Sequence, residues 1–193
     1  MFEAISGLSA AFGLSGSAGL NAYIPLLVVA LAARFPMSDP LVKLQAPFDL
    51  LGNWWAIGLI AVLLVVEIVA DKIPAVDTVN DGIQTFIRPA AGAILFAGSA
   101  NVITDIHPIL ALGAGLLVAG GVHTAKAAAR PVVTVSTAGV GNPVVSTLED
   151  IVAVVVSLLA VVLPIIAAIL LLGFLIFIIY VVRRWRRRRT IVS

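Results

Sequence analysis

The sequence contains no cysteine and few charged residues. Without cysteine, the chain can form neither a disulfide bond nor a thiolate metal site. Only 11% of its 193 residues are charged and 61% are apolar, whereas soluble domains have about 25% charged and about 45–50% apolar residues. So few polar side chains cannot cover the surface of a water-soluble protein of this size. The composition therefore excludes an ordinary soluble domain and predicts an integral membrane protein.

A β-barrel pattern is also missing. In lipid, every backbone N–H and C=O must be paired within the protein, so a spanning segment is a helix or a strand of a closed barrel. Barrel strands alternate apolar and polar residues, but Ile151 to Val182 is an apolar run without a single charge. The expected fold class is an all-α integral membrane protein. Residues 1–182 are predicted to form one transmembrane domain, and residues 183–193 a basic cytoplasmic tail.

Positive charge is concentrated at the end of the chain. Half of the twelve cations follow the last apolar run: Arg183, Arg184, Arg186, Arg187, Arg188 and Arg189. Lys and Arg collect on the cytoplasmic side of membrane spans, so this cluster predicts a cytoplasmic C-terminus that meets anionic lipid headgroups of the bilayer. It is too short and too close to the membrane to follow a nucleic-acid duplex, and no nucleic-acid partner is expected. Up to Val182 the chain carries six cations against ten anions, a net charge of −4.

Segment lengths predict about five to six membrane segments, because a bilayer core needs roughly 20 helical residues. Trp54 and Trp55 open an apolar run to Ala70, as in an interfacial aromatic belt. A second run, Ile109 to Ala129, should end at Arg130-Pro131. The last run, Ile151 to Val182, would be about 48 Å long as a helix. It must tilt, bend at Pro164 or project beyond the bilayer.

Local signals predict where two further helices begin. Thr78 to Asp81 and Ser146 to Glu149 have capping-box spacing, which predicts helix starts near Val79 and Thr147. Pro89 should bend or restart the first of these helices, because proline lacks a backbone donor.

Two stretches rich in glycine and serine or threonine, Ser15–Asn21 and Ser136–Asn142, interrupt the apolar regions. We expect both to be non-helical at membrane depth, as broken or re-entrant helices. Irregular backbone is tolerated there only where protein buries it or where it lines a cavity, which makes Asn21 and Asn142 candidate substrate-path residues. The alternative is a kink that packs on a neighbouring helix through small residues.

The two halves of the chain also resemble each other. Lys72 precedes Pro89 by 17 residues, and Lys126 precedes Pro143 by the same number. The two interrupted stretches match as well, which favours an internal repeat. The spacing leaves open whether the two halves have the same or inverted orientation. Paired interrupted helices indicate a transporter whose substrate site lies at the repeat interface. Chance similarity in a chain rich in Ala, Gly and Val is the alternative.

Acidic residues form the first candidate site. Glu67 and Asp71 are four residues apart, on one helix face, and Asp77 and Asp81 repeat that spacing. Carboxylates suit a hard divalent cation, so Glu67 and Asp71 are candidate metal ligands. Intramembrane acids are also candidate charge carriers. The alternative is an ordinary solvated loop.

The position of Glu67 gives a conditional prediction. It lies among valines and isoleucine, where a full charge would face lipid unless the side chain turned inward. If it is buried with no cation within roughly 4–6 Å, it should be protonated at neutral pH and able to exchange that proton. Lys72, Lys126 or Arg88 nearby would instead hold it ionised.

Basic residues form a second candidate site. His123, Lys126 and Arg130 are spaced by three and four residues and therefore share a helix face. They could bind a phosphate or carboxylate. The alternatives are headgroup anchors for Lys126 and Arg130 and a packing role for His123.

The segment Gly19 to Pro25, with Glu67, Asp71 to Pro74, Asp77, Asp81 and Arg88-Pro89, resembles a bacterial family of small membrane proteins called domain of unknown function 4126. The resemblance spans nearly the whole chain except the arginine tail. It implies a polytopic helical protein in which these residues are a family signature, and it supplies no activity.

The sequence has no His/Cys metal spacing, no phosphate-binding glycine loop and no nucleophile elbow, so neither an enzyme nor a cofactor is expected. The first hypothesis is a small transporter of the bacterial inner membrane, coupled to protons or binding a cation, with Glu67 and Asp71 as the charge-carrying pair. It would move a small ion or molecule. The second is an anion or lipid-phosphate carrier that uses Arg88, Lys126 and Arg130 with helix N-termini. The third is a non-transporting scaffold, and a homodimer is a further expectation.

Overall fold

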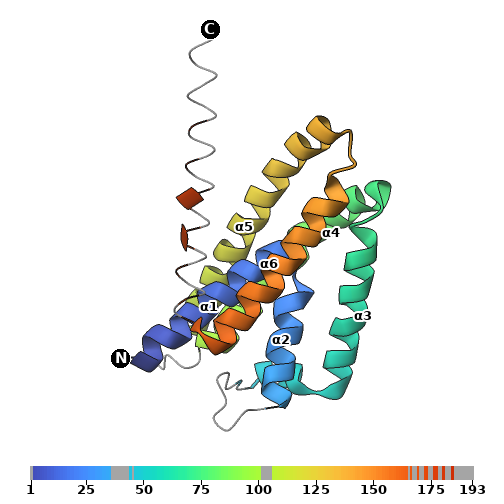
Figure 1. Cartoon of the computed structure of the whole chain (residues 1–193). Helices are drawn as coiled ribbons and strands as arrows, with labels where there is room; N and C mark the ends of the chain where they lie inside the picture. Colours follow the sequence, from blue (N-terminus) through green and yellow to red (C-terminus); the bar gives the residue numbers. More distant parts are fainter. Residues whose placement is uncertain are drawn as a thin grey trace.

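The computed structural model describes residues 2–35, 44, 46–100 and 106–164, and single residues beyond Pro164. Within them the chain is helical and has no strand, which confirms the all-α class. The helices are α1 (Phe2–Leu20), α2 (Tyr23–Arg34), a 3-10 helix η1 (Phe48–Gly52), α3 (Trp54–Ala70), α4 (Pro74–Ala100), α5 (Pro108–Thr137) and α6 (Asn142–Val162) (Figure 1). Apart from Arg184, the predicted arginine tail lies outside the described residues.

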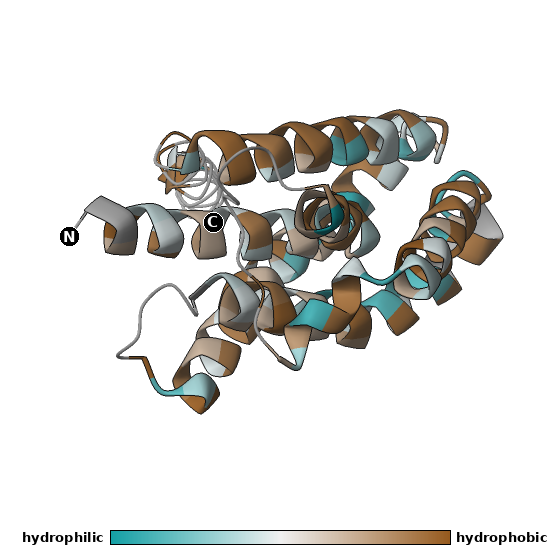
Figure 2. Cartoon of the chain, turned by 90° about the horizontal axis from the view of Figure 1, so that it is seen from below, coloured by the Kyte–Doolittle hydropathy of each residue, from teal (hydrophilic) through white to brown (hydrophobic). Residues whose placement is uncertain are grey.

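Two helices, α5 and α6, are long and apolar enough to cross a membrane. Helices α2 and α3 are apolar but shorter. Large apolar side chains lie on the outside of the molecule, including Val62, Val65, Val66 and Val69 of α3, and hydrophobic residues predominate along the helices (Figure 2). The described chain is therefore a helical protein with two candidate membrane spans.

Helix α1 occupies the centre of the bundle and contacts α4, α5 and α6, while α2 packs on α3 and α6. Glycines let the central helices approach closely. A Cβ atom on Gly19 would lie 2.5 Å from the Ala119 carbonyl oxygen, and one on Gly115 would lie 2.6 Å from Cβ of Phe96 and overlap the Gly92 carbonyl oxygen. The α1, α4 and α5 backbones are therefore held together by small residues.

Two neighbouring glycines of α5 provide a matched test of this packing. Gly115→Ala should lower the free energy of unfolding by about 1–3 kcal/mol, since the added methyl group meets the backbone of α4. A Cβ atom added at Gly113 meets nothing within 4 Å. Gly113→Ala should therefore raise the free energy of unfolding by up to about 1 kcal/mol, because alanine favours the helix more than glycine does. Chemical unfolding in detergent followed by circular dichroism measures both. Equal effects of the two variants would contradict the packing described here.

The first predicted break is much shorter than expected. Helix α1 continues through Ser15 to Leu20, so the prediction of a non-helical Ser15–Asn21 is wrong for all but Asn21. The serine hydroxyls bond to other helices, Ser15 Oγ to the Gly92 carbonyl oxygen (2.8 Å) and Ser17 Oγ to the Ala153 carbonyl oxygen (2.9 Å), and the α1 backbone stays intact. The break lies at Asn21 and Ala22, where the chain turns sharply from α1 into α2 (Figure 1).

The second predicted break is present over four residues. Residues 138–141 form a turn between α5 and α6, with Ala138 (φ 51°) and Gly139 (φ 85°) in left-handed conformation, which ends the helix. Ser136 and Thr137 belong to α5, and their hydroxyls both bond to the Val133 carbonyl oxygen of the same helix. Asn142 begins α6. The predicted bounds are therefore wrong at both ends.

Both predicted helix starts are wrong. Helix α4 begins at Pro74 and α6 at Asn142, and each has a proline in its first turn. A backbone N–H there would have no acceptor within the helix, so proline costs no hydrogen bond. The residues of the second capping box are used otherwise. Thr147 Oγ1 bonds to the Pro143 carbonyl oxygen (2.8 Å) within α6, and Ser146 Oγ reaches α3.

Two helices continue through an internal proline, so the predicted end at Arg130-Pro131 is wrong and the helix does not restart at Pro89. Helix α4 runs through Pro89 and α5 through Pro131. At Pro89 the neighbouring helix leaves room for the ring, since a Cβ on Gly120 would be 3.7 Å from Pro89 Cγ. Of the three alternatives for the last apolar run, the structure agrees with a bend at Pro164, because α6 ends at Val162 and Leu163 is not helical.

Candidate functional site

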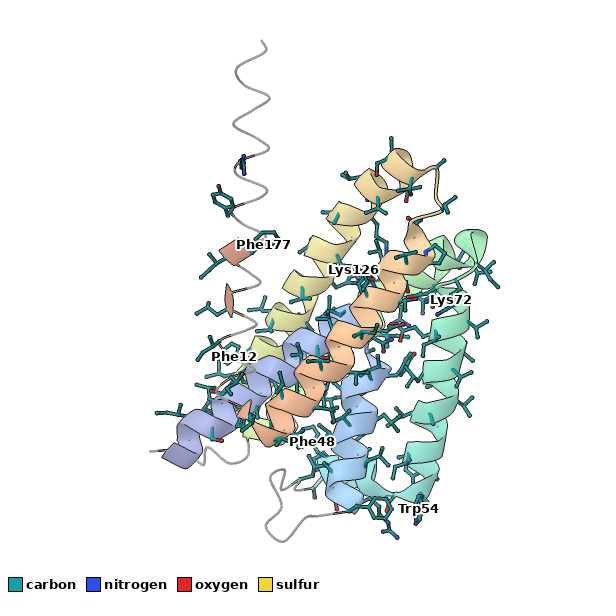
Figure 3. All side chains as sticks on the ribbon, viewed as in Figure 1. Phe12, Phe48, Trp54, Lys72, Lys126 and Phe177 are labelled. Carbon is teal, nitrogen blue, oxygen red and sulfur yellow. The ribbon has the colours of Figure 1, made fainter. Side chains whose placement is uncertain are left out.

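Polar side chains from all parts of the bundle gather near the turn that joins α3 to α4. In Figure 3 their nitrogen and oxygen atoms lie between the labelled Lys126 and Lys72, at the opposite end of α3 from Trp54. We call this group the charge cluster. Its members are Asn21, Glu67, Asp71, Asp81, Arg88, His123, Lys126, Arg130, Glu149 and Asp150.

A buried ion pair joins α3 to α4. Arg88 Nη2 lies 3.0 Å from Glu67 Oε1, and the side chains are 0% and 1% exposed. The other guanidinium nitrogen, Nη1, lies 3.2 Å from His123 Nδ1 and 3.8 Å from Asp81 Oδ1. Glu67 is turned inward, but a cation is within reach. The condition set for a protonated Glu67 is therefore not met.

Asp71 ties the end of α3 to three other helices. Its Oδ1 accepts a hydrogen bond from Asn80 Nδ2 of α4 (2.9 Å), and its Oδ2 accepts one from Ser146 Oγ of α6 (3.0 Å). Arg130 Nη2 of α5 is 3.8 Å from the same oxygen. Glu67 and Asp71 lie on one face of α3, as predicted, and both carboxylates bond to neighbouring helices.

Lys126 and Arg130 share one carboxylate on α6. Glu149 Oε2 lies 2.8 Å from Lys126 Nζ and 3.2 Å from Arg130 Nη2. Lys126 Nζ also donates to the Leu20 carbonyl oxygen (3.1 Å), and Arg130 Nη1 lies 3.4 Å from Asp81 Oδ2. Both side chains are buried within the protein. The expectation that they reach out to lipid headgroups is therefore wrong.

Asn21 links the break between α1 and α2 to the cluster. Its Oδ1 accepts from the backbone N–H groups of Tyr23 (3.0 Å) and Ile24 (3.1 Å), which satisfies donors of the first turn of α2. Its Nδ2 donates to Asp150 Oδ1 (2.9 Å). In the described part of the chain, no basic side chain lies within 4.0 Å of the Asp150 carboxylate.

The cluster holds more acids than bases. It has three strongly basic side chains and five carboxyl groups, a formal excess of two negative charges when all are ionised. Among the described residues near the cluster, three buried acceptors, Glu67 Oε2, Asp81 Oδ1 and Gln84 Oε1, and one buried donor, Arg88 Nε, have no hydrogen-bond partner. Buried charge of one sign is relieved by protons or bound cations. A proton or a bound cation would balance such an excess of carboxyl groups.

Several predicted site residues do not join the cluster. Lys72 is exposed and its Nζ bonds only weakly to the Ile68 carbonyl oxygen (3.4 Å). Asn142 lies at the far end of the α5–α6 turn, where its Oδ1 accepts from Thr134 Oγ1 (3.1 Å). The side chain of Asp77 lies outside the described residues. Lys72 and Lys126, which correspond in the predicted repeat, differ in burial, since Lys126 is buried and Lys72 is exposed. The internal repeat stays a prediction.

The structure does not support the predicted metal site at Glu67 and Asp71. Among the side chains that it describes, no three Asp, Glu or His residues come together as metal ligands. The two carboxylates meet basic and hydroxyl groups instead, because acids from α3 and bases from α4 and α5 pair across the bundle.

Two members of the charge cluster were missed from the sequence, Glu149 and Asp150. Glu149 was interpreted as part of a capping box, and Asp150 was given no role. The available signal was their place directly before the uncharged run of α6.

A family model described as Domain of unknown function (DUF4126) matches residues 8–184. The chain belongs to this family. The family match includes every member of the charge cluster and reaches Arg184, at the start of the arginine tail. No curated protein and no solved structure matches the chain.

Proposed function

We propose that the protein is a small multi-pass transporter of the bacterial inner membrane that couples solute movement to protons, with its C-terminus in the cytoplasm. The observation that supports this most is the charge cluster, five carboxyl and three strongly basic groups within an otherwise apolar helical bundle. Ionisable groups inside membrane proteins are rare, and they mark ion pathways and proton relays.

The break at Asn21 supports the same proposal. Helix α1 ends and α2 begins beside the charge cluster, and the Asn21 side chain bonds to both α2 and Asp150. Transporters commonly place solute and coupling-ion sites where a helix is discontinuous, because the exposed backbone ends bind charged groups. The pairing of a helix break with a half-buried acid therefore favours transport.

Asp150 is the proposed proton carrier. Glu67 and Asp71, the pair expected from the sequence, are engaged with Arg88 and Ser146 and serve to hold the helices together. Asp150 is half-buried and has the Asn21 amide as its partner. A carboxyl group held by a neutral donor can gain or lose a proton without breaking an ion pair, so it is the better suited acid.

The two alternative functions have less support. An anion or lipid-phosphate carrier needs cations that are available to the anion, but Arg88, Lys126 and Arg130 each lie within 4 Å of a carboxylate. A scaffold would offer its small-residue faces to other proteins, but Gly19, Gly92 and Gly115 pack against neighbouring helices of the same chain.

Uptake into proteoliposomes tests the proposal. Vesicles that contain the purified protein are given an inward proton gradient and a mixture of small cationic, anionic and neutral solutes, and mass spectrometry measures what accumulates. We expect at least one solute to accumulate, and a protonophore to abolish its accumulation. Vesicles without protein are the control. Accumulation of an anion that ignores the proton gradient would instead support the anion carrier, and no accumulation of any solute would count against transport.

A further inference from the structure

The side chain of Lys126 crosses from α5 to the end of α1. Its ammonium nitrogen lies 3.1 Å from the carbonyl oxygen of Leu20, the last residue of α1, and 2.8 Å from Glu149 Oε2 of α6. The side chain is 3% exposed. The end of a lysine side chain is thus enclosed where three helices meet, and both of its partners are oxygen atoms.

These partners have the chemistry of an alkali-cation site. The last carbonyls of a helix lack intrahelical donors and carry the negative end of the helix dipole. In transporters with discontinuous helices, such carbonyl oxygens, together with acidic groups, coordinate Na⁺. Here the carbonyl is at the C-terminal end of α1, next to the break before α2, and Glu149 supplies the carboxylate.

We propose that the Lys126 ammonium is a tethered cation that permanently fills a monovalent-cation site at the break between α1 and α2. Two consequences follow. Removing the ammonium while leaving space turns the position into a binding site for Na⁺ or K⁺. The second consequence, which rests on the proposed transport function, is that the natural protein transports without Na⁺ or K⁺.

The remaining contacts indicate that the site survives loss of the lysine. Arg130 Nη2 stays 3.2 Å from Glu149 Oε2 and continues to balance part of its charge. Asn21 still caps α2 through its own side-chain oxygen and holds Asp150, the residue next to Glu149. The Leu20 carbonyl oxygen and the Glu149 carboxylate therefore remain placed around the vacated volume.

The test measures the melting temperature of the full-length protein in detergent, in NaCl, KCl or choline chloride of equal ionic strength. The natural protein should melt at the same temperature in all three salts. Lys126→Ala should show a saturable rise in NaCl or KCl over choline chloride, as expected for a ligand that binds the folded state. Lys126→Met is the matched control, because its unbranched apolar chain fills most of the vacated volume with groups that cannot ligate a cation, and it should give no response. Adding Glu149→Gln to Lys126→Ala should remove the response.

Lys126→Gln is a second variant, for the case in which Lys126→Ala melts too low to measure. Glutamine is neutral and leaves a smaller space than alanine. The amount of Lys126→Gln protein recovered from purification in each salt is an additional readout. The proposal is overturned if neither variant prefers Na⁺ or K⁺ over choline, including the case in which neither is recovered in any salt. It is also overturned if the natural protein shows the same cation response as Lys126→Ala. Because the assay needs no transport, a cation response together with failed uptake would refute the proposed function alone.

Discussion

Replacing Arg88 with methionine is expected to lower the free energy of unfolding by about 3–5 kcal/mol, because Glu67 would be left as a buried charge without its partner. Arg88 is fully buried and Glu67 is 1% exposed, so water cannot replace the lost contact. The methionine side chain has similar length and keeps most of the volume filled. Chemical unfolding in detergent micelles, followed by circular dichroism, measures the change.

Two further variants separate the lost pairing from general damage. Arg34→Met removes an exposed guanidinium that lies 5.2 Å above the Trp54 ring, and should cost no more than about 1 kcal/mol. Glu67→Leu combined with Arg88→Met removes both charges and should be more stable than Arg88→Met alone. If Arg88→Met were as mild as Arg34→Met, the Glu67–Arg88 pair would not be the structural element described here.

Asp150→Asn is expected to reduce proton-driven solute accumulation to the level of vesicles without protein. Asparagine has the shape of aspartate and can still bond to Asn21, so the helix break should stay intact, but it cannot carry a proton. Exchange of labelled for unlabelled solute across the vesicle, which needs no net proton movement, should continue. Measuring accumulation and exchange on the same vesicles checks both expectations.

The matched control is Asp49→Asn in η1, which neutralises an exposed carboxylate. This carboxylate lies before the start of α3, whereas the cluster lies near the end of α3. It should leave both accumulation and exchange unchanged. If Asp150→Asn kept full accumulation, the proton would have to be carried by another acid of the cluster.

The sequence was sufficient for features that depend on composition and regular spacing. The all-α class followed from the lack of charge, and the bounds of α3 agree with the run from Trp54 to Ala70. Spacing of three and four residues correctly placed His123, Lys126 and Arg130 on one helix face, which the structure shows to be buried. These predictions hold because a helix fixes which residues share a face, whatever its neighbours are.

Helix ends and breaks depended on partners that local patterns do not reveal. Ser15 and Ser17 suggested a break, but α4 and α6 offer acceptors for their hydroxyl groups. Ser146 suggested a helix start, but its hydroxyl donates to Asp71, 75 residues away. In each case, a contact across the bundle replaced the local bond on which the prediction was based.

The composition of the charge cluster was only half predictable for the same reason. Glu67 and Asp71 were expected to form an acidic site, and Arg88 was one of three cations considered as a partner of Glu67, which it contacts. Which acid pairs with which base, however, depends on how α4, α5 and α6 approach α3. That geometry gives Glu67 a permanent cation and leaves Asp150 with an amide, which moves the proposed proton carrier from α3 to α6.

The central claim is that solute and protons move together, and the pH inside sealed proteoliposomes tests it most directly. Vesicles that contain a pH-sensitive dye are placed in a gradient of the solute identified by uptake, with no proton gradient imposed at the start. The account predicts a change of internal pH as the solute moves down its gradient, the same change with Asp49→Asn, and none with Asp150→Asn. Movement of the solute through the natural protein with no change of internal pH would contradict the account.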